Sequence, residues 1–335
     1  MSRKEAYGYA VARIRAMEHR LLDAAVFTRL LEAEDSASVL KILGETSYAP
    51  LLTSLSGGSF DKILEASLLE TYEELASFVP DRELPLMMRM QYDFSNVKVM
   101  LKSMFAARSG GKKRWDLLTS LASYPVDDLV SNIEAEEYRL LPFGLSSVLP
   151  KCIAVWEQSK NTLETERLLD LQMFGEMRRM AEELGFSEVT EWVKARIDGE
   201  NLRTLLRLKR FGFDASGAAS FLHEGGRIDR DLLASMIAEP FETWGRLVSF
   251  SDLSRLLSEA DVTAGFSQII MDFEKKLDEY LLDLAAASRY SPDSPCNVIA
   301  YLWSKELEVK NIRMILVSKS GSGDRESVRR LLRHV

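Results

Sequence analysis

The sequence contains very few of the residues that metal sites, disulfides and nucleophilic catalysis depend on. Among 335 residues there are two cysteines and three histidines. Cys152 and Cys296 lie far apart and show no metal-binding or redox spacing. A disulfide between them is an alternative, but two ordinary thiols in a reducing cytosol fit this usage better. The histidines (His19, His223 and His334) form no pair at metal-ligand spacing.

Long hydrophobic runs are absent as well. No stretch approaches the roughly 20 apolar residues that a membrane span needs. The opening "MSRKEAYGYAVARIRAMEHR" is interrupted by charges every few positions, so it does not read as a signal peptide. The formal net charge of −8 disfavours non-specific binding to nucleic acid or to an anionic membrane surface. If the protein works at a membrane, something else must hold it there.

Motifs for nucleotide binding and catalysis are incomplete. "SGGKKR" lacks the spacing and the hydroxyl of a phosphate-binding loop, "HEGGR" lacks the second histidine of a zinc protease motif, and no G-x-S-x-G elbow occurs. His223, inside "HEGGR", is better explained as a loop residue than as a catalytic one. We therefore expect no enzyme activity, no cofactor and no metal ion, and we favour a structural or binding role.

The pattern that is present is helical almost throughout. Apolar residues in the first segment recur at spacings of three and four, as in an amphipathic helix. The segment "FTRLLEAEDSASVLKIL" predicts two short helices, with Asp35 or Ser36 as an N-cap. "ETERLLDLQMFGEMRRMAEELG" predicts a long helix ending at Gly185, and "SQIIMDFEKKLDEYLLDLAAAS" predicts another. Alternating β-branched runs are scarce, so we expect an all-α fold.

One phrase occurs three times. It reads "DFSNVKVMLKS", "DGENLRTLLRLK" and "EVKNIRMILVSK", and its asparagines are 105 and 110 residues apart. Apolar residues stand four, eight and twelve positions before the asparagine in every copy. The aligned columns hold an asparagine (Asn96, Asn201, Asn311), an acidic residue three positions earlier (Asp93, Asp198, Glu308) and a basic residue two positions later (Lys98, Arg203, Arg313).

A weaker element accompanies the phrase. "LLTSLASYPVDDLV" follows the first copy, "LLASMIAEPFETWGRLV" follows the second, and "LLEAEDSASVLKIL" precedes the first. The repeating unit is thus a short helical pair, a long helix and the asparagine-bearing helix. The chain is also longer than one compact core usually accommodates. We predict three helical modules, covering residues 1–112, 113–225 and 226–335.

Two interpretations of the repeated asparagine remain open. The spacing of four places it on the same stripe as its apolar neighbours, so it is buried and bonded to another helix or to the nearby carboxylate. Alternatively, it is the N-cap of a helix that restarts there. Both interpretations are structural. The basic residues after it allow a functional interpretation, in which they surround a central opening and face a partner, or a local one, as a solvated face or weak ion pairs.

Three segments together resemble a known family. These are "YGYAVARIRAMEHRLLD", "NVKVMLKS" and "EVKNIRMILVSK". They are similar to the C subunit of archaeal and bacterial V/A-type rotary ATPases, and to its eukaryotic relative, the d subunit of the vacuolar proton pump. The resemblance covers essentially the full length. It implies three similar all-helical domains around a pseudo-threefold axis, arranged as a funnel.

The resemblance also implies a mechanical role without chemistry. Such a protein sits on the cytoplasmic face of the membrane proteolipid ring, receives the D–F axle, and passes torque between them for ion transport or ATP synthesis. It takes no small-molecule substrate and binds no nucleic acid. Two other classes stay open: a helical-repeat interaction scaffold unrelated to rotary motors, and a helical enzyme with an unrecognised site.

Overall fold

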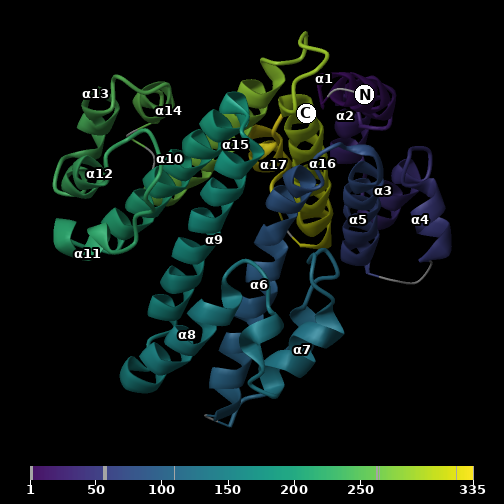
Figure 1. Ribbon diagram of the computed structural model, residues 1–335. Helices are drawn as coiled ribbons and strands as arrows, with labels where there is room; N and C mark the ends of the chain where they lie inside the picture. Colours follow the sequence, from purple (N-terminus) through teal and green to yellow (C-terminus); the bar gives the residue numbers. More distant parts are fainter. Residues whose placement is uncertain are drawn as a thin grey trace.

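The computed structural model describes residues 3–55, 59–108, 110–261, 263, 265–321 and 323–334. Throughout these ranges the regular structure is helical, and they contain no strand (Figure 1). The prediction of an all-α fold is therefore confirmed. The periodic apolar spacing explains this outcome, because residues three and four apart share one face of a helix and must bury that face together.

Three helical hairpins make up the body of the molecule, and the second helix of each carries one copy of the repeated phrase. The hairpins are α5 (Phe60–Phe78) with α6 (Glu83–Arg108), α9 (Thr162–Leu184) with α10 (Ser187–Arg210), and α15 (Phe266–Ala286) with α16 (Cys296–Ser320).

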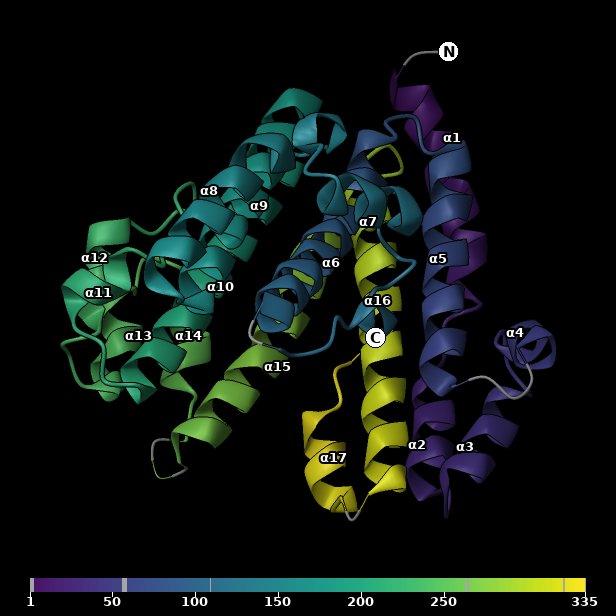
Figure 2. The same cartoon turned by 90° about the horizontal axis from the view of Figure 1, so that it is seen from below.

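The hairpins contact one another in a closed circuit (Figure 1, Figure 2). Helix α6 packs against α9 of the next hairpin, α10 packs against α15, and α16 returns to pack against α5. Helix α16 also contacts α6 across the molecule. Each helix that carries the phrase therefore packs between the first helix of its own hairpin and the first helix of the next hairpin.

Shorter helices surround the hairpins. Helix α1 (Arg3–Glu18) precedes them. The remaining elements are α2 (Ala24–Glu32), α3 (Ser36–Leu43), α4 (Ala49–Ser54), η1 (Trp115–Leu117), α7 (Val126–Glu134), η2 (Tyr138–Leu140), α8 (Leu145–Ser159), α11 (Ala215–Ala219), α12 (Arg230–Met236), η3 (Phe241–Thr243), α13 (Trp244–Leu247), α14 (Leu253–Ser258) and α17 (Arg325–Leu331). Helices α2 and α3 pack against α16, from the opposite end of the chain.

Local signals mark the start of one helix and the end of another where the sequence predicted them. The Asp35 side chain accepts a hydrogen bond from the backbone N–H of Ser38 at 2.8 Å and so caps α3. Gly185 ends α9 in the left-handed conformation, with φ of +73°, which a glycine adopts without a steric penalty. Both predictions are confirmed.

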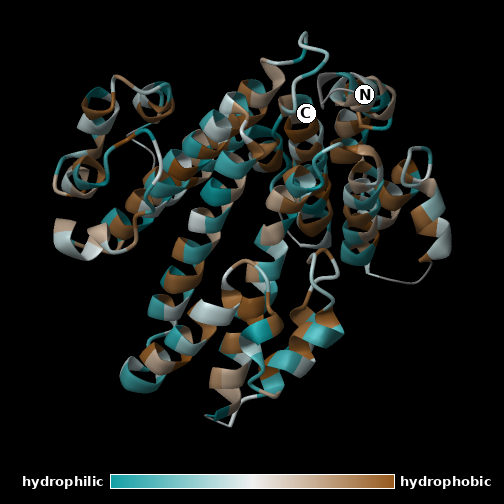
Figure 3. Ribbon diagram, in the orientation of Figure 1, coloured by the Kyte–Doolittle hydropathy of each residue, from teal (hydrophilic) through white to brown (hydrophobic). Residues whose placement is uncertain are grey.

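The core is apolar and continuous through the hairpins. All of the residues four, eight and twelve positions before the asparagines are buried except the half-buried Tyr92. Cys152 and Cys296 are buried and unpaired, and burial raises the pKa of each thiol to about 12. In Figure 3 hydrophilic and hydrophobic residues intermingle along every long helix, and among the described residues no helix is long and apolar enough to cross a membrane.

Candidate functional site

Each repeated asparagine forms the same two-bond clamp. Its side-chain N–H donates to a backbone carbonyl 22 or 23 residues downstream, and its Oδ1 accepts from the N–H of that same residue. The three clamps join Asn96 to Thr119 (2.9 and 2.9 Å), Asn201 to His223 (2.9 and 2.8 Å) and Asn311 to Arg333 (2.8 and 3.0 Å).

The clamp explains why a buried amide is tolerated inside an apolar stripe. All three asparagines are buried and lie well inside α6, α10 and α16 rather than at a helix start. Leaving a buried amide unbonded costs about 1–3 kcal/mol. Here both polar atoms are satisfied, and so are the N–H and C=O of a loop residue. The partner is thus the backbone of the loop that follows the helix, and not another helix or the nearby carboxylate, as the sequence had suggested.

The first two acidic residues of the phrase hold the same loops a few residues further on. Asp93 accepts from the N–H groups of Ser123 (3.1 Å) and Tyr124 (2.8 Å). Asp198 accepts from the N–H groups of Arg227 (2.8 Å) and Ile228 (3.1 Å). Burial raises the pKa of both carboxyl groups, that of Asp198 to about 6, although the backbone N–H groups act in the opposite direction.

The third acidic residue holds a segment from the other end of the chain. Glu308 accepts from the N–H of Leu22 at 2.5 Å, from the hydroxyl of Tyr48 at 2.8 Å and from Nζ of Lys305 at 2.6 Å. Leu22 stands two residues before α2. Tyr124 and Ile228 stand two residues before α7 and α12 in the same way. The N-terminal segment before α2 therefore takes the place, at α16, that the downstream loops take at α6 and α10.

The basic residues of the phrase are engaged in ion pairs. Lys98 of α6 pairs with Asp170 of α9, and Arg313 of α16 pairs with Asp61 of α5 at 2.9 Å. Both pairs cross from one hairpin to the next. Arg203 instead pairs with Glu200 of its own helix, while the α10–α15 contact has a pair between Arg207 and Glu274 at 2.5 Å. These pairs are partly exposed, where such interactions contribute about 0–1 kcal/mol.

A polar contact links all three phrase helices near their middle. Arg196 donates to Oε1 of Gln91 at 2.9 Å, and Gln91 donates to Oε1 of Glu306 at 3.3 Å. These residues occupy one column of the repeat, five positions before each asparagine. Sequence reasoning missed them. The available signal was a column that holds an amide, a guanidinium and a carboxylate, so that a donor, an acceptor and a group that is both occupy equivalent positions.

Aromatic rings enclose this contact. The Arg196 guanidinium lies over the rings of Trp192 and Trp303, 5.5 and 5.2 Å from their centroids, where the ring faces attract a cation. Tyr72 and Tyr92 donate their hydroxyls to Glu306 at 2.8 and 2.6 Å. The arrangement provides partners for charges near the centre of the helical body and draws α5, α6, α10 and α16 together.

Helix α1 touches the connection within each hairpin. The Tyr7 hydroxyl donates to Asp81 at 2.8 Å, before α6, and its ring packs edge-on against Phe186, before α10, with 5.4 Å between centroids. Arg15 donates to the carbonyl oxygen of Arg289, before α16, at 2.6 Å. The three connections therefore lie at one end of the molecule, which we call the connection end (the upper end in Figure 1).

The described residues contain no cluster suited to a metal ion. No set of three or more His, Cys, Asp or Glu side chains is placed to hold a metal ion in that part of the chain. His223 is buried beside Phe174, with 4.4 Å between ring centroids, and burial lowers its pKa to about 4. It is accordingly a neutral packing residue at neutral pH.

The fold and its clamps define a class before any comparison: an all-helical protein made from three hairpins that repeat one set of buried side-chain-to-backbone bonds. The family described as "ATP synthase (C/AC39) subunit" has a sequence model that matches residues 10–331, and the chain belongs to this family. The family supplies the non-catalytic C subunit of V/A-type ATPases. The resemblance seen in the sequence is confirmed.

Characterised relatives match along nearly the whole chain. The C subunit of the V-type sodium ATPase of Enterococcus hirae is 24% identical over 326 residues, which cover 96% of each chain. The C subunit of the A-type ATP synthase of Methanocaldococcus jannaschii is 26% identical over 343 residues, covering 97% of this chain and 86% of the relative. The corresponding A-type ATP synthase protein of Halobacterium salinarum is 24% identical over 336 residues, covering 92% of each.

Proposed function

We propose that this protein is the central-stalk subunit that couples the D–F axle of a V/A-type rotary ATPase to its membrane proteolipid ring. Torque then passes through it without chemistry, either to drive ion transport or to make ATP. The observation that carries the proposal is the family match across residues 10–331, which includes all three phrase helices.

The closed circuit of hairpins suits a part that transmits torque. A sideways load on one hairpin passes to both neighbours, because α6 packs on α9, α10 on α15 and α16 on α5. Close-packed helix interfaces deform little under load. Clamps at Asn96, Asn201 and Asn311 also hold the loops to the loaded helices. Load sharing of this kind supports a rigid adaptor rather than a hinged one.

We also propose that the three hairpins are related by a pseudo-threefold axis and form a funnel. Support comes from the equivalent contacts between successive hairpins and from the meeting of Gln91, Arg196 and Glu306, which are equivalent positions. In sequence the modules are residues 1–112, 113–225 and 226–335. In space we propose that α2 and α3 accompany the third hairpin, since they pack on α16.

The proposed place of work is the cytoplasmic face of the membrane, with the proteolipid ring as the anchor. The family match supports this place, because the matched relatives belong to V-type and A-type complexes of the same kind. The basic residues Lys98, Arg203 and Arg313 remain candidates for contact with the axle. In that case the partner would compete for the ion pairs that these residues make.

Co-purification tests the proposal. A tagged full-length chain is co-expressed with the axle and ring subunits encoded in the same genome, and membranes are solubilised under mild conditions. We expect both the axle and the ring to be recovered with the tag. Membranes prepared without the chain should hydrolyse ATP without pumping ions, and adding the chain back should restore pumping. Recovery of neither partner would overturn the proposed function.

A further inference from the structure

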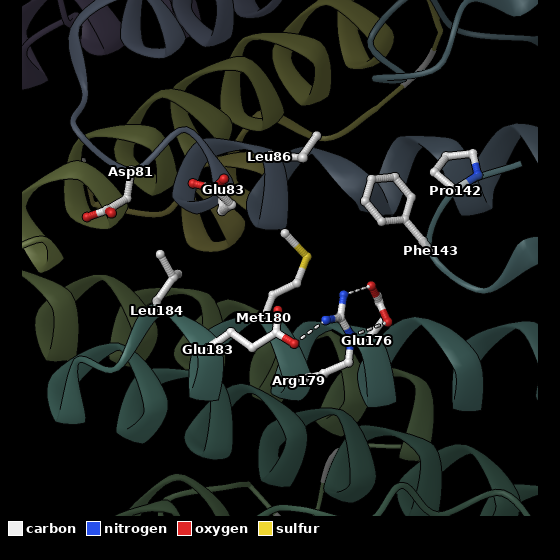
Figure 4. Close-up of a pocket in the computed structure, with 10 residues that line it drawn as sticks. All are labelled: Asp81, Glu83, Leu86, Pro142, Phe143, Glu176, Arg179, Met180, Glu183 and Leu184. Atoms are coloured by element: carbon white, nitrogen blue, oxygen red, sulfur yellow. Dashed lines mark hydrogen bonds and ion pairs between the residues drawn. The ribbon is translucent and has the colours of Figure 1, made fainter.

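An open groove lies between α6 and α9 at the connection end of the molecule (Figure 4). Its volume is about 600 Å³. Leu86 of α6 faces Met180 and Leu184 of α9 across it, so the floor is apolar. Met180 and Leu184 are largely buried, whereas Leu86 is half-buried. We call this feature the acidic groove, because its rim is rich in carboxylates.

The side chains that line the acidic groove carry more negative than positive charge. They include four carboxylates, of Asp81, Glu83, Glu176 and Glu183, and one guanidinium, of Arg179, while Asp81 also accepts from the Tyr7 hydroxyl. Arg179 already binds Glu176, at 2.5 and 3.0 Å, and also Glu183. Glu83 is exposed and makes no ion pair with any described residue. A groove with apolar walls strengthens the local field of such charges.

A fixed aromatic edge borders the groove. Phe143 holds the left-handed conformation, with φ of +56°, which is uncommon for a residue with a side chain. Gln172 of α9 donates to its carbonyl oxygen at 3.1 Å. A Cβ atom on the neighbouring Gly144 would lie 2.1 Å from the Gln172 amide nitrogen. A side chain at position 144 would displace the Gln172 amide and break this bond, so glycine here lets Gln172 hold the backbone of Phe143 beside the groove.

The same pair of helices presents the opposite charge at its other end. There Lys102, Arg108 and Lys160 surround a hollow with one lining carboxylate, Glu157. Its apolar side includes Trp156, which stacks on Phe105. We call this the basic groove. Two of its cations are already paired, Lys102 with Glu166 at 2.6 Å and Arg108 with Glu157 at 2.9 Å, so the basic groove serves here as a comparison for the acidic one.

We propose that the acidic groove docks a basic, amphipathic segment of a protein partner, whose Lys or Arg side chains meet the carboxylates while an apolar residue enters the Leu86–Met180 floor. This inference rests on the proposed function, in which the chain binds the axle and ring subunits. Anionic lipid headgroups would be repelled by the same carboxylates, which argues against a membrane surface as the occupant. Association should be fast and should weaken with salt.

Peptide binding to the full-length chain tests the inference. The probes are overlapping 15-residue peptides that cover the exposed loops and termini of the axle and ring subunits from the same genome, measured by fluorescence anisotropy at low and physiological salt. We expect the binding peptides to carry Lys or Arg beside an apolar residue. The double variant Glu83→Lys with Glu183→Lys should weaken their binding at least tenfold, because it reverses two rim charges.

The matched control is Lys102→Glu with Lys160→Glu, which reverses two charges in the basic groove. It should leave the affinity for basic peptides within about twofold of the original chain. Both double variants change exposed residues, and an unfolding midpoint equal to that of the original chain verifies their fold. The inference is overturned if no basic peptide binds, if the acidic-groove variant binds equally well, or if both variants lose binding alike.

Failure of this inference is distinguishable from failure of the proposed function. If the original chain co-purifies with axle and ring but its acidic groove binds no basic peptide, the family role stands and the docking site is wrong. If the original chain recovers neither partner, the proposed function itself is wrong. Binding of the original chain to anionic vesicles that competes with the basic peptides would also contradict the inference.

Discussion

The acidic residues of the repeat act over very different distances along the chain. Asp93 and Asp198 bond to loop residues 29–31 positions downstream. Glu308 bonds to Leu22, 286 positions away. The same column of the repeat thus holds two nearby loops and, in its third copy, joins the two ends of the chain. A repeat of local units can be completed in space by a segment from the far end of the sequence.

The chemistry of the two kinds of contact differs as well. Around Asp93 and Asp198 the bonds come mainly from backbone N–H groups. Around Glu308 they come from one backbone N–H, a tyrosine hydroxyl and the ammonium group of Lys305, and both Glu308 and Lys305 are buried. Removing one member of a buried ion pair strongly destabilises the folded protein, because the other charge stays buried without a partner. The distant contact should therefore be the more sensitive one.

The largest effect is expected for Glu308→Ala. This change leaves Lys305 buried without its carboxylate, and the free energy of unfolding should fall by about 3–5 kcal/mol. Urea unfolding followed by circular dichroism measures it. The control replaces both charges, Lys305→Met with Glu308→Leu, and should recover most of the loss. The comparison would be contradicted if Glu308→Ala lost no more stability than Asp198→Ala.

Loss of one asparagine clamp should have the next largest effect. Asn201→Ala leaves the N–H and C=O of His223 without their partners and should lower the free energy of unfolding by about 1–3 kcal/mol. Asn96→Ala and Asn311→Ala serve as equivalents in the other hairpins. Hydrogen exchange should accelerate at His223 only in the Asn201 variant and at Arg333 only in the Asn311 variant. Unchanged thermal melts for all three would refute the structural role.

A pH effect of intermediate size distinguishes the second hairpin from the first. The pKa of His223 is lowered from 6.5 to about 4, so its contribution to stability is lost as pH falls through that window. The pKa of Asp198 is raised from 3.8 to about 6, so its contribution grows as pH falls through an overlapping window. The two effects oppose each other in the original chain.

Substitution of one group should reveal the other. As pH falls from 7 to 4.5, the free energy of unfolding of His223→Gln should rise relative to that of the original chain, because only the Asp198 effect remains. Asp198→Asn should lose stability relative to the original chain over the same range. Urea midpoints at several pH values measure both shifts. Parallel shifts in the two variants would show that these pKa changes do not control the pH dependence.

The smallest effects are expected for the ion pairs between hairpins. Lys98→Ala and Arg313→Ala remove partly exposed pairs and should each change the free energy of unfolding by less than about 1 kcal/mol. The difference should shrink further at high salt, because screening weakens exposed pairs. A loss as large as that of Asn201→Ala would mean that these pairs, rather than the buried clamps, hold the circuit together.

The amino-acid sequence by itself determined the helices, their caps at Asp35 and Gly185, and a triplicated phrase with an asparagine on the apolar stripe. These features depend on spacing and on neighbouring residues, which a single sequence displays. The family resemblance was also carried by short local segments.

Only the tertiary structure decided what the polar residues bind. The clamp partners Thr119, His223 and Arg333 lie in irregular segments without periodicity, and Leu22 meets Glu308 only because the N-terminal helices pack on α16. The meeting of Gln91, Arg196 and Glu306 likewise requires three separate helices to converge. A sequence pattern reports which face a residue occupies on its own helix, whereas its partner across space is set by how distant helices pack.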